Sequence, residues 1–415
     1  MERFTAGDPA ALKRPGGRDE PALLDAVRAI VDDVRARGWN ALVEQALRID
    51  GAAPALIEVA PYAAEARRTL PAEAIAAMTL ARRNIENFHR QTRPRDIEVV
   101  TMPGLSVAKQ WRALGSAGLY VPGGKAPLFS TLMMLAIPAR IAGVGQLTVV
   151  TPPRRAGGLD PAIALAAELC GIDAIWTVGG AQAIAALAFG AGDIPAVDRI
   201  AGPGNAWVAA AKALVASLPG GPGIDLPAGP SELMVIADAS ADPATVAADL
   251  LSQAEHDPSA QVILVTPNPA LIDAVEAQLA MQVATMNTDF APARAILVGD
   301  LDEAVTIANA YAPEHLSLAT DAADSLIDRI TSAGAIFAGH HAAETFGDYL
   351  AGSSHVLPTD GAARFSGGVS TLSFMKAITV QRVSPQAARA LAAPAAVLAR
   401  LEGLEAHARA AEARA

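Results

Sequence analysis

Short apolar runs alternate with helix-period segments along most of this chain, and this alternation constrains its fold more than any other feature. A strand, a helix and a second strand in succession form a parallel pair joined by a crossover connection. The helical patterns lie at residues 21–49, 71–92, 130–143 and 207–218. The strand-like runs occupy residues 97–102, 118–121, 146–153, 174–178 and 233–238. The sequence therefore predicts an α/β fold built on parallel sheets.

Two strand-like segments resemble each other. QLTVVTPP begins at residue 146 and QVILVTPN at residue 261, and each is followed by a helical pattern. Two related α/β units would explain the likeness, although a buried strand that stops at a proline is common in unrelated sequences. The length of 415 residues exceeds what one hydrophobic core usually holds, so we expect more than one domain.

Composition and charge exclude several classes of protein. With 52% hydrophobic residues the chain can build a large core, which argues against disorder. A net charge of −11 argues against binding to nucleic acid or to anionic membranes, since both need a basic surface. The N-terminus has no secretory h-region, and the most apolar stretch, residues 132–144, is too short to span a bilayer. We therefore expect a soluble, cytoplasmic protein.

The glycine-rich turns and the single cysteine carry little specific information. No segment matches the G-x-G-x-x-G dinucleotide fingerprint, but four glycine turns precede helices, at residues 122–127, 178–183, 201–206 and 227–232. Each could present backbone N–H groups to a phosphate, and each could equally be an ordinary turn or cap. Cys170 is the only cysteine, which excludes an internal disulfide, and its apolar helical context predicts a packed core thiol.

The segment from residue 224 to residue 258 predicts a metal ligand pair. A turn rich in proline and glycine leads through Ser231 into an apolar strand, and a helix follows that carries Gln253, Glu255 and His256. Residues three apart share a helix face, whereas adjacent residues diverge. Gln253 and His256 can therefore hold one small object together, while Glu255 points elsewhere, and the object that we infer is a metal ion.

Histidines in three further segments have contexts that suggest chemistry. Pro313 before Glu314 and His315 predicts the first turn of a helix. There His315 could remove a hydroxyl proton and Glu314 could activate water, or the two could be a helix cap beside a buried histidine. Asp348 and His355 flank a glycine-rich loop, and His407 follows Glu402 on a polar C-terminal helix. His89, on an amphipathic helix, is expected at the surface or at its boundary. The adjacent His340 and His341 could bind a metal or could be solvated turn residues.

Four of these residues together suit a zinc ion. Gln253, His256, Asp348 and His407 supply two imidazoles, a carboxylate and an amide oxygen, and they leave positions open for a substrate. Their sequence separation means that only tertiary structure, or a second chain, could assemble them.

The motifs resemble those of the histidinol dehydrogenase family over about residues 20 to 410. The resemblance rests on PAGPSE followed by LLSQAEHDP, on YAPEHL, GDYLAGSSHVLPT, GLYVPGG, GGAQAIAALAFG and GPGN, in the family's order. It implies that Gln253, His256, Asp348 and His407 are zinc ligands and that Glu314 and His315 are the catalytic pair. It further implies substrate contacts and NAD contacts. Substrate-contacting positions are Ser231, His355 and Glu402, with Gln253, His256, His315, Asp348 and His407, and NAD-binding positions are Tyr120, Gln182 and Asn205.

The resemblance also implies an architecture. It predicts two incomplete Rossmann-like domains, one formed by residues 21–119 and 233–370 and the other by residues 120–232. Residues 1–20 would be an N-terminal extension. Residues 371–415 would form a C-terminal dimerisation domain. The protein would be an intertwined homodimer in which this small domain completes the partner's active site, which would explain a ligand such as His407 on a tail too short to fold alone.

The implied reaction is the four-electron oxidation of L-histidinol, through bound L-histidinal, to L-histidine. It uses NAD and one zinc ion per subunit and ends histidine biosynthesis. The alternatives are oxidation of another polar alcohol, a zinc hydrolase or lyase without NAD, and a binding protein without catalysis. Some positions depart from the family's usual pattern, which leaves the substrate less certain than the chemistry. They are Lys125, Leu128, Leu226, Ser353 and Ser354.

Overall fold

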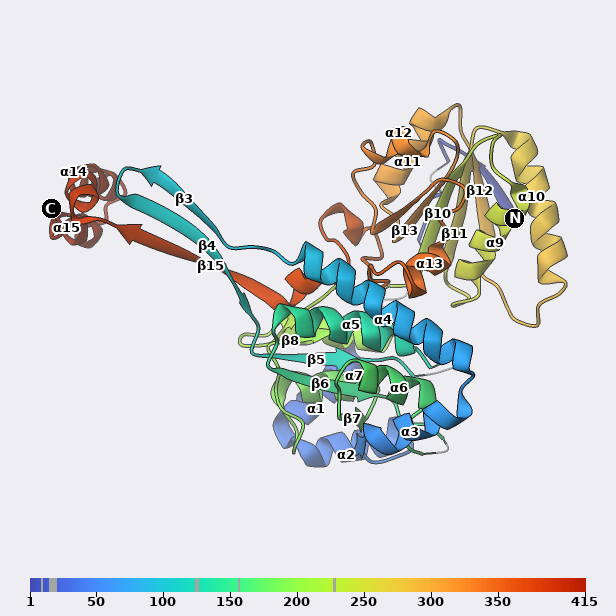
Figure 1. Ribbon diagram of the computed structural model, residues 1–415, viewed down its shortest axis with the longest axis horizontal. Helices are drawn as coiled ribbons and strands as arrows, with labels where there is room; N and C mark the ends of the chain where they lie inside the picture. Colours follow the sequence, from blue (N-terminus) through green and yellow to red (C-terminus); the bar gives the residue numbers. More distant parts are fainter. Residues whose placement is uncertain (9, 15–20, 124–126, 156, 227–228) are drawn as a thin grey trace.

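The computed structural model describes residues 1–8, 10–14, 21–123, 127–155, 157–226 and 229–415 (Figure 1). Lys125, part of the predicted N-terminal extension and parts of two glycine turns lie outside the described residues. The described strands form two six-stranded sheets and one three-stranded sheet. Apart from one edge strand, the two large sheets are parallel, so the predicted α/β class is confirmed.

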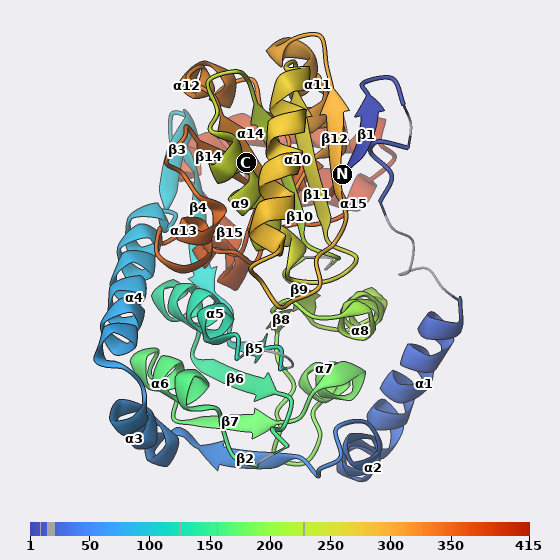
Figure 2. The same cartoon turned by 90° about the vertical axis from the view of Figure 1, so that its right-hand side faces the viewer.

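The first sheet has the strand order β2-β7-β6-β5-β8-β9. Its strands are β2 (Ala55–Glu58), β5 (Ser116–Tyr120), β6 (Gln146–Thr151), β7 (Ala174–Thr177), β8 (Arg199–Ala201) and β9 (Gly223–Ile224). The helices α5 (Phe129–Ala142), α6 (Pro161–Leu169), α7 (Gly180–Phe189) and α8 (Ala206–Ser217) connect them. One face is covered by α5 and α6 with α3 (Val59–Thr69) and α4 (Ala72–Thr92), and the other by α7 and α8 with α1 (Pro21–Arg37) and α2 (Trp39–Ile49) (Figure 2).

The second sheet has the order β1-β12-β11-β10-β13-β14 and is parallel throughout. Its strands are β1 (Glu2–Thr5), β10 (Glu232–Ala237), β11 (Gln261–Thr266), β12 (Ala293–Leu297), β13 (His315–Ala319) and β14 (Ala335–Ala338). The connecting helices are α9 (Pro243–Ala254), α10 (Pro269–Val283), α11 (Leu301–Tyr311) and α12 (Ala323–Ile327), and α13 (Glu344–Tyr349) follows β14. Side chains of β10 alternate between the two helix-covered faces, which is why the strand is apolar at nearly every position.

The two large sheets share one topology. In each sheet, five consecutive strands of the chain follow the same path. The first of them, β5 or β10, is fourth in the sheet order. The next two strands are added on one side of it and the last two on the other side. The similar segments at residues 146 and 261 are β6 and β11, which hold the same place in the two orders. Equivalent positions favour the interpretation that two related α/β units produced the likeness.

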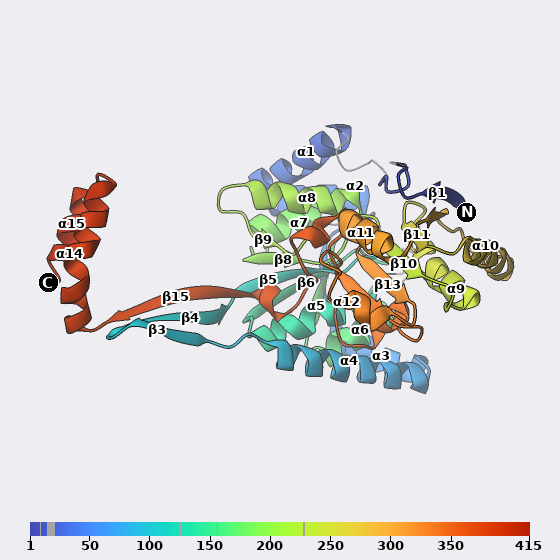
Figure 3. The same ribbon diagram turned by 90° about the horizontal axis from the view of Figure 1, so that it is seen from above.

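Three antiparallel strands form an arm that projects from the two bodies. They are β3 (Ile97–Met102), β4 (Leu105–Ala113) and β15 (Met375–Val383), in the order β15-β4-β3. The arm ends in α14 (Pro385–Leu401) and α15 (Glu405–Glu412), which lie far from both large sheets (Figures 1 and 3). The fully buried side chains of these two helices are all alanines, whereas Val397, Leu398 and Leu401 are exposed. Short 3-10 turns at Ala362–Arg364 and Thr371–Phe374 lead into the arm.

The predicted boundaries differ from the observed ones in three places. Residues 21–49 form two helices, because Gly38 adopts a left-handed φ of 59° that ends α1. Residues 21–119 were predicted to belong with residues 233–370, but β2 pairs with β7 and α1 to α4 pack on the first sheet. The N-terminus is not a separate extension, since β1 pairs with β12. Pairing of an edge strand depends on distant residues, so local pattern does not reveal it.

Among the described helices, none combines the length and the apolar character that crossing a membrane would require.

Candidate active site

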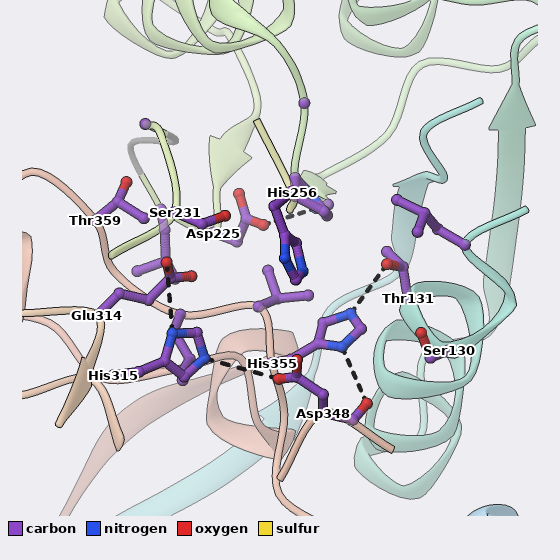
Figure 4. A pocket seen from close by; sticks show the side chains of 18 of the residues that line it. Ser130, Thr131, Asp225, Ser231, His256, Glu314, His315, Asp348, His355 and Thr359 are labelled. Carbon is purple, nitrogen blue, oxygen red and sulfur yellow. Dashed lines mark hydrogen bonds and ion pairs between the residues drawn. The ribbon is translucent and has the colours of Figure 1, made fainter. Parts of the chain in front are cut away.

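A pocket of about 170 Å³ lies between the two large sheets. It faces the carboxyl ends of β5 and β8 in the first sheet and the amino ends of β10 and β13 in the second. Where the strand order reverses, between β5 and β8, an α/β sheet usually binds its ligand. Seven of the predicted site residues line this pocket (Figure 4): Ser231, Gln253, His256, Glu314, His315, Asp348 and His355.

Glu314 and His315, the predicted catalytic pair, were expected in the first turn of a helix, and this expectation is wrong. α11 ends at Tyr311, Ala312 follows in the left-handed region with a φ of 56°, and β13 begins at His315. Pro313 was interpreted as the first residue of a new helix, but proline is also common just after a helix ends. Because Leu233 of β10 is paired with His315, the residues that precede these two strands lie side by side.

The backbone of Glu232 holds both members of the pair. Its N–H donates to Glu314 Oε2 at 3.0 Å, and its carbonyl accepts from His315 Nδ1 at 3.1 Å. A histidine whose Nδ1 carries the proton has a free lone pair on Nε2. Among the described residues, His315 Nε2 has no protein partner within hydrogen-bonding distance, and it lies 3.7 Å from Asp348 Oδ1. The arrangement leaves His315 with a proton acceptor directed toward Asp348.

Burial sets the charge states of the pair. It lowers the pKa of His315 to about 3, so the imidazole is neutral at pH 7. It raises the pKa of Glu314 well above the usual range, and the carboxylates of Glu232, Glu344 and Asp348 add to that rise. The neutral imidazole has a lone pair that can accept a proton, and the raised pKa makes the Glu314 carboxylate a stronger base than an ordinary one.

Gln253 and His256 present unpaired ligand atoms to the same space. The Gln253 side chain is 1% exposed, and neither of its amide atoms has a hydrogen-bond partner within the described part of the chain. An unsatisfied buried amide is costly, so this side chain is expected to bind a group that the protein does not supply. His256 lies in the turn just after α9 and its Nδ1 donates to Ser252 O at 2.9 Å, which leaves Nε2 free to ligate a metal. The helix geometry predicted the proximity, although His256 falls outside the helix.

Glu344 is a site residue that the sequence analysis missed. His315, Glu344 and Asp348 offer ligand atoms that all lie within 4.8 Å of one another. Glu344 is 2% exposed, and its Oε1 lies 3.5 Å from His315 Nδ1. Its spacing of four from Asp348 places both carboxylates on one face of α13, and that spacing could have revealed it.

His355 lines the same pocket. Its Nδ1 donates to the carbonyl of Asp348 at 3.1 Å, and its Nε2 lies 3.0 Å from Thr131 Oγ1. The rings of His256, His315 and His355 and the side chain of Asp348 surround one space in Figure 4. Burial lowers the pKa of His355 to about 4, so it is neutral at pH 7.

Glu402 and His407 do not reach this pocket in their own chain. Both side chains are exposed on the tail, at the far end of the arm from the two sheets (Figure 1). The structure therefore brings together three of the four predicted metal ligands within a single chain.

The predicted NAD-binding residues cluster near the carboxyl ends of strands in the first sheet. Tyr120 OH accepts from the Gly180 N–H at 3.2 Å, and Gln182 Nε2 donates to Asp50 Oδ2 at 3.1 Å. Asn205 caps α8 through bonds from the N–H groups of Trp207 and Val208. None of the three predicted residues lines the pocket itself, but Gly204, next to Asn205, does.

A buried ion pair supports the turn after β8. Lys212 and Asp225 pair with each other. Both also bond to Gly202, whose carbonyl accepts from Lys212 Nζ and whose N–H donates to Asp225 Oδ2. All three residues line the pocket. Local pattern gave no sign of this pair, because its members come from a helix and a later loop.

The remaining expectations have mixed outcomes. Cys170 is packed in the core as predicted, and burial raises the pKa of its thiol to about 12. His340 and His341 lie in a turn, where His340 pairs with Asp321. His89 was predicted at the surface or at its boundary but is fully buried. It falls in line with Met78, Ala81 and Ile85 on the face of α4 that packs inward.

Comparisons with known proteins show which protein family the chain resembles. The sequence model described as histidinol dehydrogenase matches residues 13–415. A histidinol dehydrogenase of Xanthomonas euvesicatoria is 46% identical over 96% of this chain and 94% of its own length. The crystal structure of histidinol dehydrogenase from Elizabethkingia anophelis superposes with a TM-score of 0.94 at 37% identity, covering 100% of this chain and 98% of that one. A putative aldehyde dehydrogenase from Burkholderia cenocepacia shares the fold, with a TM-score of 0.51 at 16% identity and coverage of 92% and 100%.

Proposed function

The chain belongs to the histidinol dehydrogenase family, as an oxidoreductase of histidine biosynthesis that oxidises histidinol, and we propose that this oxidation takes place in the pocket between the two sheets. The observation that carries the proposal is the free Nε2 of His315, held by Glu232 and facing Asp348 beside the unpaired amide of Gln253. A proton acceptor and open ligand atoms in one pocket are what oxidation of a metal-held alcohol needs.

A zinc ion fits the residues present. Gln253, His256 and Asp348 would hold it, with the fourth protein ligand supplied by His407 of a second subunit. One zinc per subunit would orient the substrate and polarise its polar groups. The proposal is supported by the unpaired Gln253 amide and by the fixed tautomer of His256, since a metal-binding histidine donates its other N–H to a protein acceptor.

In the proposed reaction His315 Nε2 accepts the hydroxyl proton as the alcohol carbon loses a hydride. NAD, held at the carboxyl edge of the first sheet near Tyr120, Gln182 and Asn205, would supply the acceptor for that hydride. The aldehyde stays in the pocket, where Glu314 takes a proton from the water that adds to it and His315 returns its proton to the aldehyde oxygen. Loss of a second hydride from the hydrate, together with the protons of its two hydroxyl groups, gives the carboxylate, so each substrate consumes two NAD molecules. Ser231, His355 and Glu402 would contact the substrate.

The protein is proposed to work as a homodimer with shared active sites in the cytoplasm, where its NAD cosubstrate is available. Exposed leucines on α14 and a tail whose buried side chains are alanines support a second subunit as its partner. Glu402 and His407 would then reach the pocket of the partner rather than that of their own chain.

The test is the yield of NADH per L-histidinol consumed, measured on purified protein with and without a zinc chelator. We expect a ratio near two that collapses when zinc is removed and returns when zinc is restored. A ratio near one would mean that the second oxidation fails and would overturn the role of Glu314. No NADH with L-histidinol, but NADH with another polar alcohol, would change the substrate, and none with any alcohol would favour a hydrolase or lyase.

A further inference from the structure

A buried ion pair lies behind the residue that holds the catalytic pair. The Glu232 side chain is 1% exposed, and its carboxylate is bound by Arg14, with Nε to Oε1 at 2.5 Å and Nη2 to Oε2 at 3.0 Å. The N–H of Asp360 adds a third bond, to Oε1 at 3.1 Å. Two parallel bonds from a guanidinium fix the position of a carboxylate more tightly than a single bond does.

Arg14 also holds the end of the helix that leads to the catalytic pair. Its Nη2 donates to the carbonyl of Tyr311 at 2.8 Å, and its guanidinium lies 3.8 Å from the centre of the Tyr311 ring. Tyr311 is the last residue of α11, two residues before Pro313. One side chain from the N-terminal segment therefore connects the start of β10 with the turn that precedes β13.

The two turns at this network are strained. Within the described residues, Ala312 and Asp360 are the only non-glycine residues with positive φ, at 56° and 54°. Such a conformation costs roughly 1 kcal/mol and persists only where surrounding contacts enforce it. Ala312 follows the carbonyl that Arg14 binds, and the N–H of Asp360 binds Glu232. The Arg14–Glu232 pair is thus positioned to enforce both turns.

We propose that Arg14 is a positioning residue for Glu314 and His315, which acts through Glu232 without touching the substrate. The backbone N–H and carbonyl of Glu232 orient the two catalytic side chains, and the guanidinium fixes Glu232 in place. The inference rests on the proposed function, because it takes Glu314 and His315 as the catalytic pair.

The test compares three variants of the full-length, zinc-loaded protein. Because a small displacement of a catalytic group slows the chemical step more than binding, Arg14→Ala is expected to lower kcat by roughly 10- to 100-fold. The KM for histidinol should change by less than about 3-fold, since ground-state contacts remain. Arg14→Lys keeps the charge but not the paired bonds, and we expect a loss of about 10-fold. Methylguanidinium should restore part of the activity of Arg14→Ala.

Arg3→Ala is the matched control. Arg3 lies in the same N-terminal segment and ties it to the second sheet through Asp273 and Glu276, far from the catalytic pair. We expect wild-type kcat from this variant. Equal losses in Arg3→Ala and Arg14→Ala would overturn the inference, since both would then act by loosening the segment. Wild-type kcat in Arg14→Lys would also overturn the inference. The same holds if Arg14→Ala loses zinc along with its activity and methylguanidinium does not restore that activity.

His315→Asn, measured in parallel, separates the inference from the proposed function. If this variant keeps full activity, the assignment of the catalytic pair is wrong. If it is inactive while the Arg14 variants behave as wild type, only the positioning role of Arg14 fails.

Discussion

The first and second sheets have the same strand order, but the pocket uses opposite ends of their strands. In the first sheet it faces the carboxyl ends of β5 and β8, where the order reverses. In the second sheet it faces the amino ends of β10 and β13. Shared topology therefore does not decide which edge of a sheet carries the chemistry.

The carboxyl ends of the strands in the second sheet differ from the amino ends, where the pocket lies. Where β10 and β13 end, Asp238 accepts hydrogen bonds from Ser240 and from Thr320 Oγ1, and Ser240 Oγ accepts from the Asp321 N–H. These polar groups satisfy one another. At the amino edge, by contrast, Gln253 and His315 Nε2 find no partner among the residues that the structure describes. The difference lies in which polar side chains remain unpaired, because an unpaired group can bind a ligand.

The largest effect on kcat should come from removing a proposed metal ligand at the amino ends of β10 and β13. Substitution His256→Asn is expected to lower kcat by roughly 10,000-fold, because loss of metal polarisation costs several kcal/mol in the transition state. Zinc per subunit, measured by atomic absorption, should fall in parallel. His340→Asn, at the carboxyl edge of the same sheet, is the control and should keep its zinc and activity. Comparable losses in both variants would break the comparison between the two edges.

A second effect should appear in the stability of the helical layer on the first sheet. Burial of His89 lowers its pKa to about 4, from 6.5 in the unfolded chain. The folded state thus resists protonation, so this contribution is complete above pH 6.5 and is lost as pH falls toward 4. The loss amounts to at most about 3 kcal/mol. Urea unfolding at pH 7.5 and at pH 4.5 should show a smaller acid-induced loss in His89→Leu than in the wild type, and equal losses would contradict the assignment.

The smallest effect should come from the carboxyl ends of β10 and β13, where the polar groups bond to one another. Thr320→Val removes the hydroxyl that donates to Asp238 Oδ2 and leaves Asp238 with its bonds from Ser240. The same hydroxyl accepts from the Ala322 N–H, so the substitution removes two hydrogen bonds. We expect a loss of about 2 kcal/mol in the free energy of unfolding and an unchanged kcat. Denaturant unfolding and steady-state kinetics measure the two quantities. A large fall in kcat would show that this edge takes part in catalysis.

The fold class could be predicted from sequence because strand and helix periods are local. Strands β6, β7 and β10 and helices α4 and α5 fall close to the predicted ranges. The assignment of residues 21–119 failed, since β2 pairs with a strand more than a hundred residues away. The position of Gly38 also broke a helix whose apolar pattern continued through it.

The candidate site was predictable where recognisable motifs carried it. Motifs around Gln253, Glu314 and Asp348 located the pocket residues, although the local structure at Pro313 was predicted wrongly. Glu344 was missed because it lies just outside the motif that begins at Gly347. Arg14 was missed for a physical reason, as its partner Glu232 is more than two hundred residues away and no local pattern joins the two.

The position of β1 affects how the chain folds during synthesis. Of the described strands β1 is made earliest, and β12, the described strand with which it pairs, follows about 290 residues later. At 5 to 20 residues per second, β1 waits about 15 to 60 s for that partner. In that interval the ribosome completes residues 21–224, which contain every strand of the first sheet. The first body can therefore fold while the N-terminal strand is still unpaired, and β1 joins the edge of the second sheet afterwards.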